Sequence, residues 1–392
     1  MTEETIKRKE KKVEYIELIY DLIFVYIIGK NNSLLHIFKG GFVKPEALIA
    51  YIFCTLAIIQ IWNFTTFYIN MFGRNSVRDH IFLFINMYLM YFIGQSVRID
   101  FGNYITQYHI AWGLILVNIC LQYLIELRNH KEDIWNRDLI NRMIFALSCE
   151  AVLVFLGAIF HTVIGTVLSG VAIFTGIILT AFGRNKSEGG QIDFAHLSER
   201  AMLYVVFTFG EMIIALSGYF IGNGSWNWNT IYFSSMAFLI VVGLFLSYGF
   251  VYDNLINREG NFNGMLYMVI HIFIIFSMNN ITASLEFMRE EEVSLLPKML
   301  FITGSVIAYF VFLLSLKGYA KYQCKPTKKF IIEAGIITVA FVVLMIIFRE
   351  QMHINIFISA AFVFSVFLII YNFSRKPLYK ENSQLTGSIG TR

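Results

Sequence analysis

The sequence is poor in charge, in proline and in long polar segments. Of its 392 residues only 15% are charged and four are proline, whereas 57% are hydrophobic and 17% are aromatic. Soluble domains carry about 25% charged residues, so this chain lacks the groups needed to cover a water-facing surface. Three of its four cysteines lie inside apolar runs, which excludes a disulfide framework and a cysteine metal box.

Several functional motifs are also missing. The sequence contains no P-loop, no Gly-x-Gly-x-x-Gly fingerprint, no His-Glu-x-x-His and no Gly-x-Ser-x-Gly. We therefore expect no cofactor, and a non-enzymatic role is favoured over an enzymatic one. The absence of a basic recognition element in a soluble context excludes nucleic acid as a partner.

What the chain has instead is a series of long apolar runs. About 20 mostly apolar residues are needed to cross the hydrocarbon core of a bilayer as a helix. The sequence predicts an all-α polytopic membrane protein with about twelve spans. They are 16–38, 46–72, 80–97, 104–127, 139–160, 163–183, 200–221, 228–252, 263–287, 296–316, 328–348 and 354–373.

Basic residues predict the orientation. With the N-terminus inside, the inner segments hold 24 of the 31 Lys and Arg residues and the outer loops hold six. The positive-inside rule then places both termini in the cytoplasm. The charged first residues show no cleavage site, so they are not read as a signal peptide.

The predicted spans divide into two groups of six. The division gives a charged N-terminus (1–15), a first half (16–183), a cytoplasmic loop (184–199), a second half (200–373) and a cytoplasmic tail (374–392). Glu17 and Glu199 open the first and seventh spans 182 residues apart, and Gln95 and Asn279 are 184 apart. Such offsets are typical of a parallel six-helix repeat, although apolar helices also align by chance.

The first span carries two acidic residues. Glu17 and Asp21 are four residues apart and therefore share one helical face. Two interpretations remain open: they are interfacial caps paired with a nearby Arg or Lys, or they form an acidic cytoplasmic entrance for a cation or proton.

Lys30 lies in the unusual run Gly29–Ser33, about 20 Å along the helix from Ile16. The apolar stretch before it is too short to span, so we expect a break of the first helix inside the membrane. An early end of the helix near the outer surface is the alternative. We expect Lys30 to need a counter-ion, either Glu150 or Glu211.

The fifth and seventh spans each contain an acidic residue at depth. Glu211 lies twelve residues past Glu199, about 18 Å deeper, and Glu150 lies in the fifth span. Charge at such depth costs at least about 2.5–3.5 kcal/mol and usually faces a bundle interior or a cavity. We expect ion or proton handling at Lys30, Glu150 and Glu211, with a structural ion pair as the alternative.

His196 and Glu199 are weak candidates for a divalent metal, together with Asp193 three residues earlier. A polar helix entry is the commoner explanation, so no metal site is predicted. Trp62 and Trp112 are expected to anchor the membrane interfaces, and most of the amides in the spans are expected to join helices.

Two motifs resemble those of the bacterial low temperature requirement A (LtrA) family. They are Tyr15-Ile16-Glu17-Leu18-Ile19-Tyr20-Asp21-Leu22-Ile23-Phe24-Val25 and His196-Leu197-Ser198-Glu199-Arg200, the latter followed by Gly210-Glu211. Trp62, Tyr68 and His271 also fit the family's pattern, whereas Phe209, Met212 and Lys30 depart from it. The resemblance implies a bacterial inner-membrane protein linked to growth in the cold, and it implies no settled biochemical activity.

These observations predict a secondary transporter or channel for a small ion or solute. Its expected partners are the lipid bilayer and that ion or solute, with a homo-oligomer left open. The alternatives are a membrane-embedded enzyme acting on a lipid or isoprenoid-linked substrate, and a non-catalytic sensor or assembly factor. The candidate site residues are Glu17, Asp21, Lys30, Glu150, Glu199, Arg200, Glu211 and His271.

Overall fold

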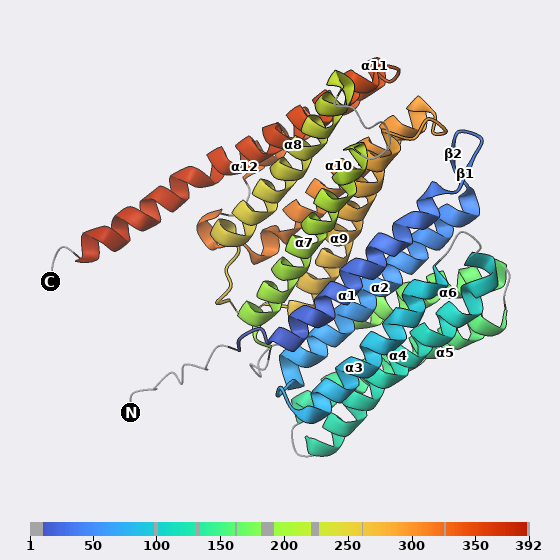
Figure 1. Cartoon of the computed structure of the whole chain (residues 1–392). Coiled ribbons are helices and arrows are strands. Elements are labelled where there is room, and N and C mark those ends of the chain that lie inside the picture. Colours follow the sequence, from blue (N-terminus) through green and yellow to red (C-terminus); the bar gives the residue numbers. More distant parts are fainter. Residues whose placement is uncertain are drawn as a thin grey trace. The chain divides into compact units, whose positions relative to one another are not determined.

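The computed structural model is helical along nearly all of the chain that it describes (Figure 1). The described residues are 11–97, 101–130, 134–160, 163–181, 192–220, 227–260, 262–324 and 327–389. They include the helices α1 (Tyr15–Asn31), α2 (Pro45–Phe72), α3 (Val77–Ser96), α4 (Phe101–Asn129), α5 (Ile134–Ile159), α6 (Val163–Ala181), α7 (Phe194–Leu216), α8 (Trp228–Phe250), α9 (Gly264–Phe287), α10 (Leu295–Ser315), α11 (Lys328–Ile347) and α12 (Met352–Ile389).

Shorter elements extend or connect some of these helices. Single turns of 3-10 helix are η1 (Asn32–His36), η2 (Ser217–Phe220), η4 (Leu316–Tyr319) and η5 (Tyr322–Cys324), while η3 (Val251–Leu255) is a π-helical turn that continues α8. A hairpin of β1 (Phe38–Lys39) and β2 (Phe42–Val43) follows η1.

The helical architecture confirms a polytopic membrane protein. Ten of the described helices are long and apolar enough to cross a bilayer. The two described helices that fall short of that standard are α3 and α6, the second of which has an apolar part limited to Ile164–Thr180. The predicted boundary between the fifth and sixth spans at His161 and Thr162 lies outside the described residues.

The chain forms two compact units. Unit 1 comprises Met1–Asn31, Phe53–Tyr204 and Arg258–Val269, and unit 2 comprises Asn32–Ile52, Val205–Asn257 and Ile270–Arg392. Helices α2, α7 and α9 therefore contribute residues to both units. Within unit 1, α3, α4, α5 and α6 pack in sequence order, and within unit 2, α12 packs against α8, α10 and α11.

The first helix is unbroken where a break was expected. It remains α-helical through Gly29, Lys30 and Asn31 and tightens into the 3-10 turn η1 only at Asn32. The buried Asn31 donates from Nδ2 to Thr55 Oγ1 on α2 at 3.3 Å. This hydrogen bond occupies the side chain that would otherwise compete with the helical backbone. The prediction of a break across 29–33 is thus wrong for its first three residues.

The hairpin after η1 turns on two glycines. Gly40 and Gly41 both have positive φ, +64° and +84°, as a two-residue hairpin turn of type I′ requires. The carbonyl of Gly41 accepts a hydrogen bond of 2.7 Å from the backbone N–H of Ser294, just before α10. A Cβ at Gly41 would overlap the Ser294 hydroxyl, whereas one at Gly40 would meet nothing within 4 Å.

We expect Gly41→Ala to lower the thermal unfolding temperature in detergent more than Gly40→Ala. Both substitutions pay about 1–2 kcal/mol for positive φ at an L-residue, but only Gly41→Ala also displaces Ser294. Equal unfolding temperatures for the two variants would contradict the contact between the hairpin and the start of α10.

Candidate functional site

Arg200 is the centre of a buried charged cluster in unit 1. Although arginine is the largest charged side chain, Arg200 is fully buried, two turns into α7. Arg200 binds Glu17 and Asp21 on α1 and Thr66 on α2, and Trp62, four residues before Thr66, binds Asp21. A spacing of four places both members of a pair on one helical face. These residues and His196 are called the Arg200 cluster below.

Asp21 binds the guanidinium of Arg200 through both of its carboxylate oxygens. Arg200 Nη2 donates to Asp21 Oδ1 at 2.6 Å, and Nε donates to Oδ2 at 3.2 Å. The indole of Trp62 donates from Nε1 to the same Oδ1 at 2.8 Å. Arg200 Nη1 donates to Glu17 Oε2, and Nη2 lies 3.4 Å from Thr66 Oγ1. Bidentate, charge-assisted contacts of this kind are the strongest hydrogen bonds that side chains make.

The hydrogen bonds around His196 assign its tautomer. Asn70 accepts from the backbone N–H of Asp193 at 3.2 Å and donates to the carbonyl of Asp193 at 2.8 Å, which fixes the orientation of its amide. The amide nitrogen also lies 3.0 Å from His196 Nδ1, so Nδ1 is the acceptor. The ring proton is therefore on Nε2, which faces Glu17 Oε2 at 3.6 Å.

Lys11 contributes positive charge beside the Arg200 cluster. Glu17 and Asp21 bring two negative charges against the single positive charge of Arg200. Lys11 supplies a second positive charge that acts on Glu17. Desolvation lowers the pKa of the Lys11 ammonium below its ordinary value, while the attraction of Glu17 acts in the opposite direction.

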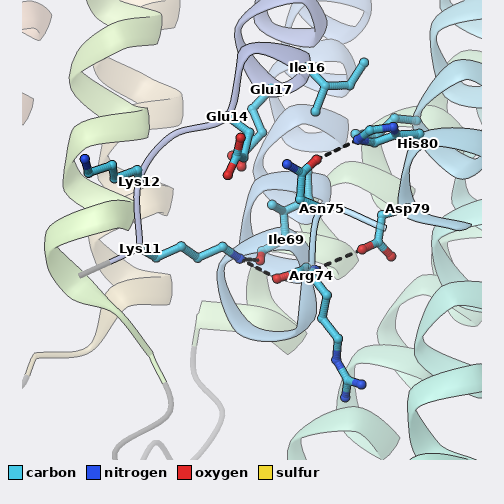
Figure 2. Close-up of a pocket in the computed structure, with 12 residues that line it drawn as sticks. Lys11, Lys12, Glu14, Ile16, Glu17, Ile69, Arg74, Asn75, Asp79 and His80 are labelled. Atoms are coloured by element: carbon cyan, nitrogen blue, oxygen red, sulfur yellow. Dashed lines mark hydrogen bonds between the residues drawn. The ribbon is translucent and has the colours of Figure 1, made fainter. Parts of the chain in front are cut away.

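A pocket of about 460 Å³ lies beside the cluster (Figure 2). Figure 2 shows Lys11 reaching to the end of α2, where Nζ donates to the carbonyls of Ile69 and Gly73, the latter at 2.8 Å. A cation is favoured at this place because the last carbonyls of a helix carry partial negative charge. Twelve residues line the pocket: Lys11, Lys12, Glu14, Ile16, Glu17, Ile69, Gly73, Arg74, Asn75, Asp79, His80 and Leu83. Glu17 therefore belongs both to the pocket and to the Arg200 cluster.

Glu150 occupies a second buried polar site in unit 1. It is fully buried near the middle of α5, and its Oε2 accepts from Gln60 Nε2 on α2 at 3.2 Å. Gln60 Nε2 also donates to the carbonyl of Ile173 on α6 at 3.2 Å. Gly176 on α6 makes room, because a Cβ there would overlap Glu150 Oε2 and Gln60 Nε2.

The structure does not give Lys30 an acidic partner. Lys30 is exposed in the last turn of α1, with Nζ 5.7 Å from the centre of the Tyr26 ring. Among the described residues it makes no ion pair. The prediction that Glu150 is the counter-ion of Lys30 is wrong, because the position of Lys30 at the helix end lets the ammonium reach outward and Glu150 binds Gln60 instead. The pairing with Glu211, which belongs to unit 2, stays a prediction.

The remaining candidates, Glu199, Glu211 and His271, are not members of the Arg200 cluster. Glu199 is half-buried and makes no ion pair within the described part of the chain. Glu211 belongs to unit 2 and is half-buried on α7. His271, also in unit 2, is fully buried with Nε2 3.0 Å from the Tyr248 hydroxyl.

Sequence reasoning misread the tryptophans. Trp62 and Trp112 are fully buried, so the prediction that they anchor the interfaces is wrong. Trp62 instead packs on Tyr204 with ring centres 4.4 Å apart and holds Asp21. The position of Trp62 near the middle of α2, far from either end of a long apolar run, is the signal that could have shown this.

Another buried acid was also missed. Glu126 near the end of α4 is fully buried and accepts from Arg78 Nη2 at 2.6 Å. His130 lies 3.7 Å from its other oxygen. In the sequence Glu126 lies near Arg128, at a loop predicted to be cytoplasmic, so it resembles an ordinary loop charge that a neighbouring arginine neutralises.

The metal interpretation finds no set of ligands. Within the described ranges, no group of three or more His, Cys, Asp or Glu side chains is placed to hold a metal ion. Asp193 Oδ1 accepts a hydrogen bond of 3.0 Å from the backbone N–H of His196, so this side chain caps the first turn of α7.

The motifs of the first and seventh spans, far apart in the sequence, thus meet in one cluster. The model of the family described as bacterial low temperature requirement A protein (LtrA) matches residues 12–369. The chain belongs to the LtrA family. No curated protein and no solved structure matches it. Every member of the Arg200 cluster lies inside the part of this LtrA chain that the family model covers.

We expect Arg200→Gln to destabilise this LtrA protein strongly. Removing one partner from a buried ion pair leaves an uncompensated charge and costs about 3–5 kcal/mol. Thermal unfolding in detergent, followed by tryptophan fluorescence, measures the effect.

The matched control is Arg128→Gln, at the exposed last turn of α4. A change at an exposed position is expected to stay within about 0.5 kcal/mol. Adding Asp21→Asn to Arg200→Gln is expected to recover part of the loss, because one unpaired carboxylate disappears. Equal unfolding temperatures for the two arginine variants would contradict the role of the cluster.

Proposed function

We propose that this LtrA protein is a secondary transporter or channel for a small ion or solute in the bacterial inner membrane. In this proposal both termini are cytoplasmic, as the distribution of Lys and Arg predicts. The observation that carries the proposal is Glu17, which lines the pocket beside α1 and also binds the fully buried Arg200.

Buried charge inside membrane spans is the physical reason for this choice. Glu17, Asp21 and Arg200 all lie in helices that can span a bilayer, and each is buried. Ionisable residues at such positions are costly and usually mark an ion or substrate pathway. A solute that enters the pocket would meet Glu17 and could compete with Arg200 for that carboxylate.

The proposal assigns different roles to the candidate residues. Glu17 and Asp21 form the cytoplasmic entrance, with Arg200 as the cation that holds them. Glu150 is the acidic group proposed further along the route, and Glu211 is proposed to handle ions within unit 2. Lys30 has no part in this route, because its ammonium is exposed at the end of α1.

Ion flux into liposomes tests the proposal. Purified protein would be reconstituted, and uptake of H⁺, Na⁺, K⁺ and Cl⁻ followed with ion-sensitive dyes. We expect wild-type flux above that of protein-free vesicles for at least one ion. Glu17→Gln is expected to lower it by about tenfold, the effect of about 1.4 kcal/mol on a barrier.

The control variant is Glu46→Gln in the first turn of α2. Glu46 is exposed and lies 3.9 Å from Lys44, away from the cluster. Its flux should equal that of the wild type. No flux for any of the four ions would contradict ion transport, and no flux for a wider panel of small solutes as well would contradict the proposal and favour the enzyme or the assembly factor. Equal flux for Glu17→Gln and Glu46→Gln would remove Glu17 from the entrance.

Growth in the cold is the cellular role that family membership suggests. We propose that transport by this protein becomes limiting at low temperature.

A further inference from the structure

We propose that Glu150 is a proton-binding site in the membrane interior, which makes the proton an ion that this protein carries. The proposal rests on the transport function above and names its coupling ion. It assigns to Glu150, Gln60 and Gly176 a function separate from that of the Arg200 cluster.

The surroundings of Glu150 favour a neutral carboxylic acid. The side chain is fully buried, and the residues one helical turn away, Ala146, Leu147 and Val154, are buried and apolar. No Lys, Arg or His of the described chain forms an ion pair with it. A buried carboxylate without a positive partner loses its hydration and gains no attraction in return, so protonation is favoured.

Charged and titratable groups on the neighbouring helices bind elsewhere. On α5, Arg142 is 3.3 Å from Asp138. On α4, Glu126 binds Arg78 and His109 Nε2 lies 2.6 Å from Ser169 Oγ on α6. The other buried titratable side chains of α2 and α4 include Cys54, Tyr68, Tyr108 and Tyr123, while Cys120 on α4 and Cys149 on α5 are half-buried.

The hydrogen bonds assign the proton to one oxygen. The carbonyl of Ile173 can only accept, so the nitrogen of the Gln60 amide must face it. The same nitrogen donates to Glu150 Oε2, which is therefore the acceptor oxygen of the carboxyl group. The proton is then carried on Oε1.

Two buried oxygens at the site have no hydrogen-bond partner among the described residues, Glu150 Oε1 and Gln60 Oε1. Both side chains are more than nine-tenths buried. Once protonated, Glu150 Oε1 is a donor without an acceptor, and Gln60 Oε1 is an acceptor without a donor, which is unfavourable for both in an apolar interior. Water can accept one of these hydrogen bonds and donate the other, and it is also the molecule that delivers the proton.

Gly176 provides the space that the carboxyl and amide groups occupy. A Cβ at this position would overlap both Glu150 Oε2 and Gln60 Nε2, so α6 approaches the carboxyl group through a residue without a side chain. The site is therefore built by three helices around the carboxyl and amide groups.

The chemical step is a proton transfer. On release, the Oε1–H bond breaks, its electron pair stays on Glu150, and the proton passes to water. On uptake, a hydronium ion returns the proton to Oε1. No oxidant, reductant or other reactant is required.

Infrared difference spectroscopy of the full-length protein in liposomes tests the proposal. The wild type is expected to show the C=O stretching band of a protonated carboxylic acid. The band should shift in D₂O and disappear as the pH is raised. Glu150→Gln should remove it, whereas Glu333→Gln should leave it intact, because Glu333 is an exposed partner of Lys329 on α11.

Two results would overturn the proposal. If Glu150→Gln removes no band, Glu150 is ionised. The second result is a band that Glu150→Gln removes but that, in the wild type, responds neither to D₂O nor to pH. Glu150 would then be a neutral acid that does not exchange its proton. Should Glu150→Gln fail to fold, Glu150→Asp replaces it, and the proposal then requires a shifted, pH-sensitive band.

Dye-detected proton flux separates this proposal from the transport proposal. We expect Glu150→Gln to reduce proton flux to the level of protein-free vesicles. Wild-type flux of another ion together with a static infrared band would retain the transporter and overturn its proton coupling. A titrating band in a wild type that passes no ion would retain the proton site and overturn transport.

Discussion

The cost of charge in a low-dielectric interior governs this structure. Arg200 is fully buried, so its guanidinium loses its hydration. Ion pairs and hydrogen bonds within the protein must offset this loss of hydration free energy. Arg200 makes these contacts with Asp21 and Glu17 on α1, with Trp62 and Thr66 of α2 completing the shell. One side chain of α7 thereby joins α1 and α2 to α7 within unit 1.

The second buried acid is stabilised differently. Gln60 and Trp62 are two residues apart on α2, about 200° around the helix, so they face opposite sides. Trp62 donates a hydrogen bond to Asp21, and Gln60 donates one to Glu150. The same stretch of α2 thus supports an ionised carboxylate with an arginine partner and a carboxyl group without one. Because of this contrast, we assign the cytoplasmic entrance to the Arg200 cluster and proton binding to Glu150.

The sequence was informative about class and less so about partners. Apolar runs predict helices directly, because the bilayer sets their length, and the spacing of Glu17 and Asp21 predicts their common face. Which cation they face depends on tertiary packing, and the predicted span 200–221 begins at Arg200, which gives no sign that this side chain is buried. Lys30 shows the reverse error, since counting depth from Ile16 could not reveal that α1 ends one residue later. The repeat stays a prediction, although α2 and α8–η3 begin 183 residues apart (45 and 228) and end 183 apart (72 and 255).

Charge movement through the wild-type protein is the most direct test of the central claim that its buried charges handle ions. Proteoliposomes adsorbed on a solid-supported membrane would be exposed to rapid jumps in pH or salt concentration while the current is recorded. The account predicts a protein-dependent current on at least one jump, with the pH jump as the first choice. A correctly folded protein that gives no current on any jump would contradict it.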